Sequence, residues 1–102
     1  MAYVYAYTVA GELWYIGKGS GQRSGRHLRR AKRYAKGLPM HRISPWQIDL
    51  ASALESGATV NIEILADNLT CDAAFAREIE LISRLQPLKN KLAGGNGCLC
   101  RN

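Results

Sequence analysis

The chain has 102 residues, of which 47% are hydrophobic, and a formal net charge of +6. This length and composition predict one folded domain with its own core and exclude a chain that is disordered as a whole. No apolar run approaches the roughly 20 residues of a membrane-spanning helix, and the N-terminus lacks the features of a signal peptide. We therefore expect a soluble, cytoplasmic protein that does not enter a membrane.

The basic residues are concentrated in the first half of the chain. Nine of the fourteen Lys and Arg residues lie between Lys18 and Arg42, and Glu12 is the only acid before position 49. Such a patch is typical of proteins that bind polyphosphate, although a solvated basic helix has the same pattern. A membrane surface fits less well, because the segment has no continuous apolar face.

The three cysteines are Cys71, Cys98 and Cys100. Their odd number argues against a disulfide framework. A structural zinc site usually has four ligands, and both histidines of this chain lie far upstream of the Cys98-x-Cys100 pair. We therefore expect free thiols.

The N-terminal part of the chain predicts a β-hairpin followed by a helix. Residues 2–9 alternate tyrosines with small or β-branched residues, and residues 13–17 form the return strand after a turn at Ala10-Gly11. The glycine-rich residues 17–21 then break regular structure. A helix follows from about residue 22 to residue 36.

The rest of the chain predicts two more helices and a third strand. Ser44-Pro45 is a favourable start for a helix through about residue 56, residues 60–64 alternate like a strand, and Thr70 caps a helix over 71–85. The order ββααβα predicts an α+β fold in which a small three-stranded antiparallel sheet is flanked by helices. We expect residues 1–102 to form a single domain with a loose tail from about 94 to 102.

Glu78 is an acidic residue on the apolar side of a predicted helix, where a charged side chain is not expected. Phe75, Ile79, Ile82 and Leu85 mark an apolar stripe of the last predicted helix, and Glu78 lies on that stripe. A carboxylate there is costly unless it is paired with an arginine or bound to a cation. Glu80, by contrast, falls on the exposed face, four residues before Arg84 and within reach of an ion pair.

Three other features are compatible with phosphate chemistry. The glycines of residues 17–21 allow the backbone to approach a phosphate, although the segment matches neither a Walker loop nor a dinucleotide motif. Arg23 and His27 are four residues apart and share one face of the predicted helix, where they are either a phosphate and proton-transfer pair or solvated basic residues. The tyrosines of residues 2–9 form either a packing surface or a poised hydroxyl whose lowered pKa would let it accept a proton from water.

Together these residues resemble the GIY-YIG nuclease superfamily. Tyr3-Val4-Tyr5 stands in place of its Gly-Ile-Tyr, and Tyr15-Ile16-Gly17 follows after nine residues. Arg23 with His27, then Glu78, then Asn90 correspond in order to its later motif residues. The resemblance covers roughly residues 2–95, although the short loop after Gly17 leaves Arg26 as a rival to Arg23 for the catalytic arginine.

The resemblance implies a metal-dependent DNA endonuclease that nicks one strand per active site. It implies one Mg²⁺ or Mn²⁺ held by Glu78. It also implies that Tyr5, or else Tyr15, positions and deprotonates the attacking water, and that Asn90 orients the metal site or the backbone. The implied catalytic set is Tyr5, Tyr15, Lys18, Arg23, His27, Glu78 and Asn90.

The basic helix is expected to follow the DNA backbone. Its predicted DNA-binding residues are Arg26, Arg29, Arg30, Lys32, Arg33 and Lys36. The resemblance favours a phage or mobile-element origin. It leaves open whether the protein is a monomer or a homodimer, and whether its substrate is DNA or RNA. Two rival interpretations are a non-catalytic nucleic-acid-binding module of the same fold and a domain whose basic patch meets an acidic protein.

Overall fold

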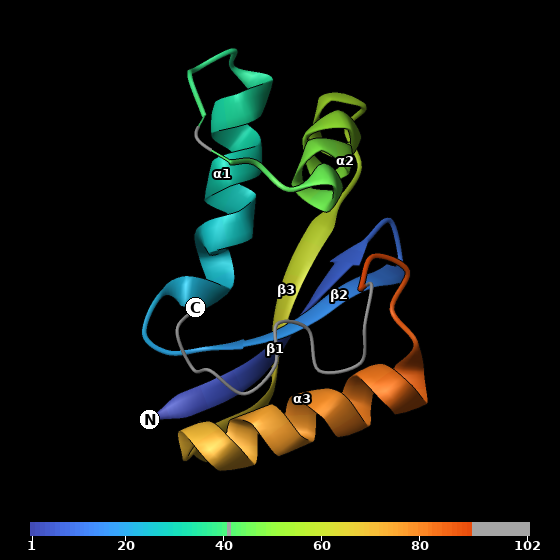
Figure 1. Cartoon of the computed structure of the whole chain (residues 1–102). Coiled ribbons are helices and arrows are strands. Elements are labelled where there is room, and N and C mark those ends of the chain that lie inside the picture. Colours follow the sequence, from blue (N-terminus) through green and yellow to red (C-terminus); the bar gives the residue numbers. More distant parts are fainter. Residues whose placement is uncertain (41, 91–102) are drawn as a thin grey trace.

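The first strand is buried on both faces because helices cover both sides of the sheet. The computed structural model describes residues 1–40 and 42–90, and β1 (Ala2–Val9) is the central strand of a three-stranded antiparallel sheet of order β2-β1-β3. Figure 1 shows α1 and α2 on one side of the sheet and α3 on the other. The predicted fold class and the element order ββααβα are confirmed.

Two hydrophobic clusters follow from the alternation along β1. The three tyrosines and Val9 pack with Ala31, Leu50 and Ala51 under α1 and α2. Val4 and Ala6 face the other way and pack with Ile16, Ala74 and Ile82 under α3. The large side chains on one face and the small ones on the other thus set how closely the two helical layers approach the sheet.

The hairpin turn is a tight one with two residues in the left-handed region. Ala10 has φ 51° and Gly11 has φ 84°, and Val9 pairs with Glu12 across the turn. Two positive φ values are what a two-residue hairpin of matching twist requires. The return strand β2 (Glu12–Gly19) is longer than predicted, because Gly17 and Gly19 remain paired with β1 instead of breaking the sheet.

The basic helix is interrupted near its start. A 3₁₀ turn at Arg23–Gly25 precedes α1 (Arg26–Ala35), so the single helix predicted from residue 22 begins later as an α-helix. Gly37 has φ 76° just beyond it, as a helix-terminating glycine should. The second helix α2 (Pro45–Glu55) begins at the predicted cap, with Ser44 at the N-cap.

The third strand pairs with the first strand and not with the second. β3 (Val60–Leu69) runs antiparallel to β1 and is longer than the alternation of residues 60–64 suggested. It leads directly into α3 (Cys71–Leu85), where the Thr70 side chain accepts a hydrogen bond from the Ala73 N–H at 3.1 Å. The predicted cap of this helix is therefore confirmed.

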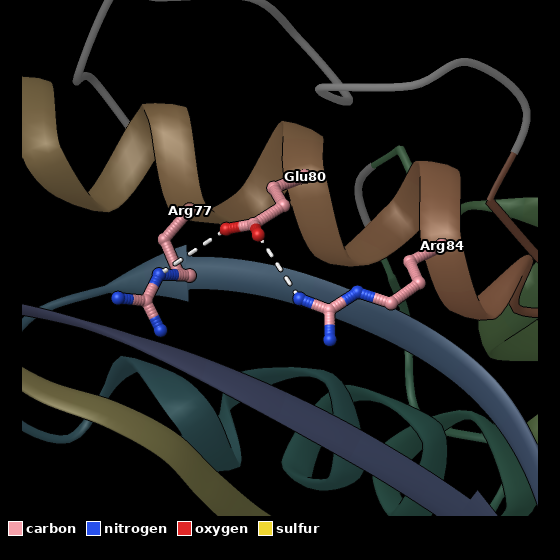
Figure 2. A network of polar contacts seen from close by, with 3 residues as sticks. All are labelled: Arg77, Glu80 and Arg84. Carbon is pink, nitrogen blue, oxygen red and sulfur yellow. Dashed lines mark hydrogen bonds and ion pairs between the residues drawn. The ribbon is translucent and has the colours of Figure 1, made fainter.

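The buried row of α3 differs from the predicted stripe. Ala74, Glu78 and Ile82 are its buried residues, whereas Leu85 is 47% exposed. The burial of Glu78 is confirmed, and the three buried residues have the i, i+4, i+8 spacing of one narrow helix face. Glu80 is exposed and pairs with Arg84 at 3.0 Å and with Arg77 at 3.5 Å, as Figure 2 shows.

Two further expectations concern cysteines and membranes. Cys71 is disulfide-bonded, which corrects the expectation of free thiols: an odd number of cysteines excludes complete pairing but not a single bridge. Cys98, Cys100 and the predicted loose tail lie outside the described residues. Within residues 1–40 and 42–90, no helix is long and apolar enough to span a bilayer.

Candidate active site

A pocket of about 380 Å³ lies where both helical layers meet the β2 side of the sheet. Its walls come from β1, β2, the 3₁₀ turn and all three helices. The lining residues are Tyr5, Tyr15, Lys18, Arg23, Arg26, His27, Arg30, Arg42, Ser44, Gln47 and Glu78. The structure thus brings together six of the seven predicted catalytic residues, from segments up to 73 positions apart in the chain.

The three tyrosines of β1 are not equivalent. The Tyr3 hydroxyl donates to the Gly21 carbonyl at 2.7 Å and accepts from the Ser24 N–H at 2.9 Å. The Tyr7 hydroxyl donates to the Ser24 carbonyl and accepts from the Leu28 N–H. These two phenols fasten the start of α1 to the sheet, so only Tyr5 among the three lines the pocket.

Gly17 allows Tyr5 to reach the pocket. The two residues are direct partners in the β1–β2 ladder. A Cβ on Gly17 would lie 2.7 Å from the Tyr5 hydroxyl oxygen and 2.9 Å from the Tyr15 ring. The tyrosine ring therefore lies across a strand position that no side chain can occupy, which explains a glycine in the middle of a strand.

The environment of Tyr5 opposes the predicted role of proton acceptor. Burial is the main cause that raises the pKa of the Tyr5 phenol above its ordinary value, and the neighbouring Tyr15, Tyr7 and Glu78 raise it further. The expectation of a lowered pKa is therefore wrong for this structure, and the phenol is protonated at neutral pH. Burial likewise raises the pKa of Tyr15 to about 12, where its ring stacks on Trp46 at a centroid distance of 4.4 Å.

His27 lies among these rings as a neutral imidazole. Its Nε2 is 2.9 Å from the Tyr5 hydroxyl oxygen, and its Nδ1 is 2.7 Å from Gln47 Nε2. Burial, with help from the charges of Arg26 and Arg30, lowers the pKa of His27 to about 4. Near neutral pH the ring therefore acts as a hydrogen-bonding group and carries no charge.

Glu78 and Lys18 form the polar floor of the pocket. They are 4% and 5% exposed, and they reach it from α3 and β2. Burial raises the pKa of Glu78 to about 7, although the Lys18 ammonium and backbone N–H partly oppose that rise. A carboxyl group held so close to neutrality binds either a proton or a cation readily.

The arginines divide into pocket residues and outward-facing residues. Arg23 and Arg26 both line the pocket, so the structure brings both rivals for the catalytic arginine to the site. Arg30 also lines it, but its guanidinium donates to the Gln47 side chain and to the Arg42 carbonyl. The other predicted DNA-binding residues are exposed and do not line the pocket: Arg29, Lys32, Arg33 and Lys36.

Asn90 does not line the pocket, and its side chain instead binds the backbone of β2. Its Oδ1 accepts from the Ile16 N–H at 2.9 Å, and its Nδ2 donates to the Ile16 carbonyl at 3.0 Å. Ile16 lies between Tyr15 and Gly17, so the bracing acts next to two residues of the site. Of the two roles implied for Asn90, the geometry is that of a residue that orients the backbone.

Sequence reasoning missed Ser44 and Gln47 as site residues, and it did not single out Arg42. The signal for the first two was present, because Ser44 and Gln47 have the spacing of a capping box at the start of α2. Nothing local indicated that this box also faces His27, since that contact joins two different helices.

Comparison of the chain with protein-family models, with curated proteins and with solved structures gave no match.

Proposed function

We propose that this protein is a metal-dependent DNA endonuclease of the GIY-YIG type that hydrolyses phosphodiester bonds and nicks one strand per active site. One observation carries the proposal: a buried carboxyl group lies on the floor of a pocket whose walls are cationic. Among the described lining residues Glu78 is the only acid, against five cations, Lys18, Arg23, Arg26, Arg30 and Arg42. Such a pocket favours a polyanion that is accompanied by a divalent cation.

The donor set fits Mg²⁺ or Mn²⁺ bound by one protein ligand. No group of three or more His, Cys, Asp or Glu side chains is arranged for a metal within the described part of the chain. A magnesium ion commonly keeps several waters and takes one or two carboxylates together with substrate phosphate oxygens. Glu78 is the residue that would hold it, and the ion would supply Lewis-acid polarisation of the phosphate.

The remaining residues of the pocket bind and orient the substrate. Lys18 and Arg23 or Arg26 neutralise the charge that develops on the phosphate oxygens, a contribution that is often the largest one in catalysis. Tyr5, which stays protonated, donates its hydroxyl hydrogen to an oxygen of the scissile phosphate and so orients that phosphate. The attacking water bonds to phosphorus as the bond to the leaving oxygen breaks, and one proton of the water passes in net terms to the leaving oxygen. The surrounding rings, with Tyr15 on Trp46, keep that hydroxyl in a fixed place.

The decisive experiment is a nicking assay on supercoiled plasmid with Mg²⁺ or Mn²⁺. We expect conversion to open circles, and we expect EDTA or the substitution Glu78→Gln to abolish it. Glu80→Gln is the matched control, because Glu80 carries the same charge on the same helix but is exposed and pairs with Arg77 and Arg84. Equal losses in the two variants would refute the assigned role of Glu78.

The strongest alternative is a nucleic-acid-binding module without catalysis. A gel-shift on the same samples separates it from the nuclease. Retained DNA binding without metal-dependent nicking, across plasmids of varied sequence, would favour the module. Loss of binding even at low salt would instead favour a domain that meets an acidic protein.

A further inference from the structure

The side-chain amide of Gln47 has its orientation fixed by two donors. Gln47 is a buried residue in the first turn of α2. Its Oε1 accepts from the Ser44 backbone N–H at 3.1 Å and from Arg30 Nε–H at 3.2 Å. Both of these groups can only donate, so the amide oxygen must face them and the amide nitrogen must face His27.

The orientation of Gln47 determines which nitrogen of His27 carries the proton. Gln47 Nε2 is 2.7 Å from His27 Nδ1 and can only donate, so Nδ1 must accept. The neutral imidazole then carries its single proton on Nε2. That N–H donates to the Tyr5 hydroxyl oxygen at 2.9 Å.

Tyr5 consequently keeps its own hydroxyl hydrogen for another acceptor. The donors run in one direction from Arg30 through Gln47 and His27 to Tyr5, and they begin at a guanidinium that cannot accept. In such a chain each hydrogen bond polarises the next donor in the same direction, and this strengthens the next hydrogen bond. The free end of the chain is a phenol O–H in the pocket that also holds Glu78 and the arginines.

We propose that Gln47 is a positioning residue that holds His27 in its Nε2–H form and thereby directs the Tyr5 hydroxyl hydrogen at the substrate. The natural acceptor is a phosphate oxygen, because its negative charge grows during hydrolysis and a hydrogen-bond donor stabilises it. The effect on catalysis rests on the proposed nuclease function, whereas the tautomer of His27 does not. The two can therefore be tested separately.

The tautomer is measured by ¹⁵N NMR of the imidazole at neutral pH. Substitution of the other histidine, His41→Gln, leaves His27 as the only imidazole and assigns its signals. We expect Nε2 to show the shift of a protonated ring nitrogen and Nδ1 that of an unprotonated one. A proton on Nδ1 would overturn the proposal without any need for a Gln47 variant.

Gln47→Glu reverses the polarity of the chain while keeping its shape. A carboxylate still accepts from Ser44 and Arg30, but it can only accept from His27, so the proton should move to Nδ1. In the neutral ring, which the same spectrum identifies by its single protonated nitrogen, Nε2 must then accept from Tyr5, and this withdraws the phenol hydrogen from the substrate. A spectrum that keeps the proton on Nε2 alone would overturn the proposal.

The catalytic part is tested on the same variant. We expect kcat for nicking to fall by about 10- to 100-fold, by analogy with changes to the groups that orient metal-binding histidines, while DNA binding is retained. Asn61→Asp, an exposed change on β3 that adds the same charge, should leave kcat unchanged. A reversed tautomer with unchanged kcat would refute the positioning role. The expected tautomer in a wild-type protein that never nicks DNA would refute the proposed function and leave the assignment of His27 intact.

Discussion

At the scale of single residues, Glu78 is kept at a cost to stability. Its pKa in the folded protein is about 7 against an ordinary 4.5, so between these pH values the folded state binds more protons than the unfolded state. The free energy of unfolding therefore falls as the pH rises through this window. Removing the ionisable group should reverse that loss.

We predict that Glu78→Gln raises Tm at pH 8 and has no such effect at pH 4. The gain at pH 8 should be about 2 kcal/mol, which is less than the full pKa shift implies because the carboxyl group faces an open pocket. Thermal unfolding across pH checks this. Mg²⁺ should raise the Tm of the wild type but not that of the variant; stabilisation of both would place the ion elsewhere.

Gly17 is the second residue whose replacement has a defined consequence. In Gly17→Ala the new methyl group would contact the Tyr5 hydroxyl and the Tyr15 ring at less than 3 Å. We expect a loss of about 1–3 kcal/mol in the free energy of unfolding, as for other overpacked sites. Chemical denaturation measures it.

Gly25→Ala is the matched control for this change. The methyl group there would come within 3 Å only of the end of the Arg29 side chain, which is exposed and free to move aside. Equal losses in the two variants would show that the general cost of replacing glycine, and not contact with Tyr5, is responsible.

At the scale of elements, the chain after α3 covers the outer edge of β2. Leu88 and Lys89 donate backbone hydrogen bonds to the carbonyls of Leu13 and Trp14, and Asn90 binds both backbone groups of Ile16. A free strand edge is a common site of fraying and association. The segment therefore keeps the strand that carries Tyr15, Gly17 and Lys18 in register.

We predict that Asn90→Ala lowers the free energy of unfolding by about 1–2 kcal/mol, the value of two hydrogen bonds that water can partly replace. The Ile16 amide should lose its protection in hydrogen exchange, because its acceptor is gone. Asn61→Ala, at an exposed position of β3, should change neither quantity. An unchanged Ile16 amide in Asn90→Ala would contradict the bracing role.

At the scale of the whole molecule, two helices among residues 1–40 and 42–90 expose positive charge on different sides of the sheet. Lys32 and Arg33 are exposed on α1, whereas Arg77 and Arg84 are exposed on α3, across the sheet, where Glu80 partly neutralises them. Of these two helices, α1 is the one whose arginines also line the pocket, through Arg26 and Arg30. Long DNA should therefore contact α1 and leave α3 free.

We predict that the double substitution Lys32→Gln and Arg33→Gln weakens DNA binding and reduces its salt dependence. The slope of log K against log salt should fall by about 0.9 for each DNA phosphate that the variant no longer neutralises. The matched double substitution Arg77→Gln and Arg84→Gln should leave the slope unchanged. Similar reductions in both would indicate that net charge, and not the α1 surface, governs binding.

The features that could be predicted from the sequence are those that depend on residues close together in the chain. The type and order of the elements, the caps at Ser44 and Thr70 and the burial of Glu78 could all be predicted, because periodicity and capping depend on neighbours within a few residues. The pocket was predicted in part, from the spacing of residues that resemble a known motif.

Only the tertiary structure decided which strand is central, how far β2 extends and which groups surround Tyr5. These depend on partners brought from distant parts of the chain: β3 on β1, the Tyr5 ring over Gly17, and Gln47 against His27. The direction of the Tyr5 pKa shift likewise depends on groups from distant parts of the chain. The sequence shows a tyrosine on a strand near basic residues, but the burial that raises the pKa of its phenol exists only in the assembled fold.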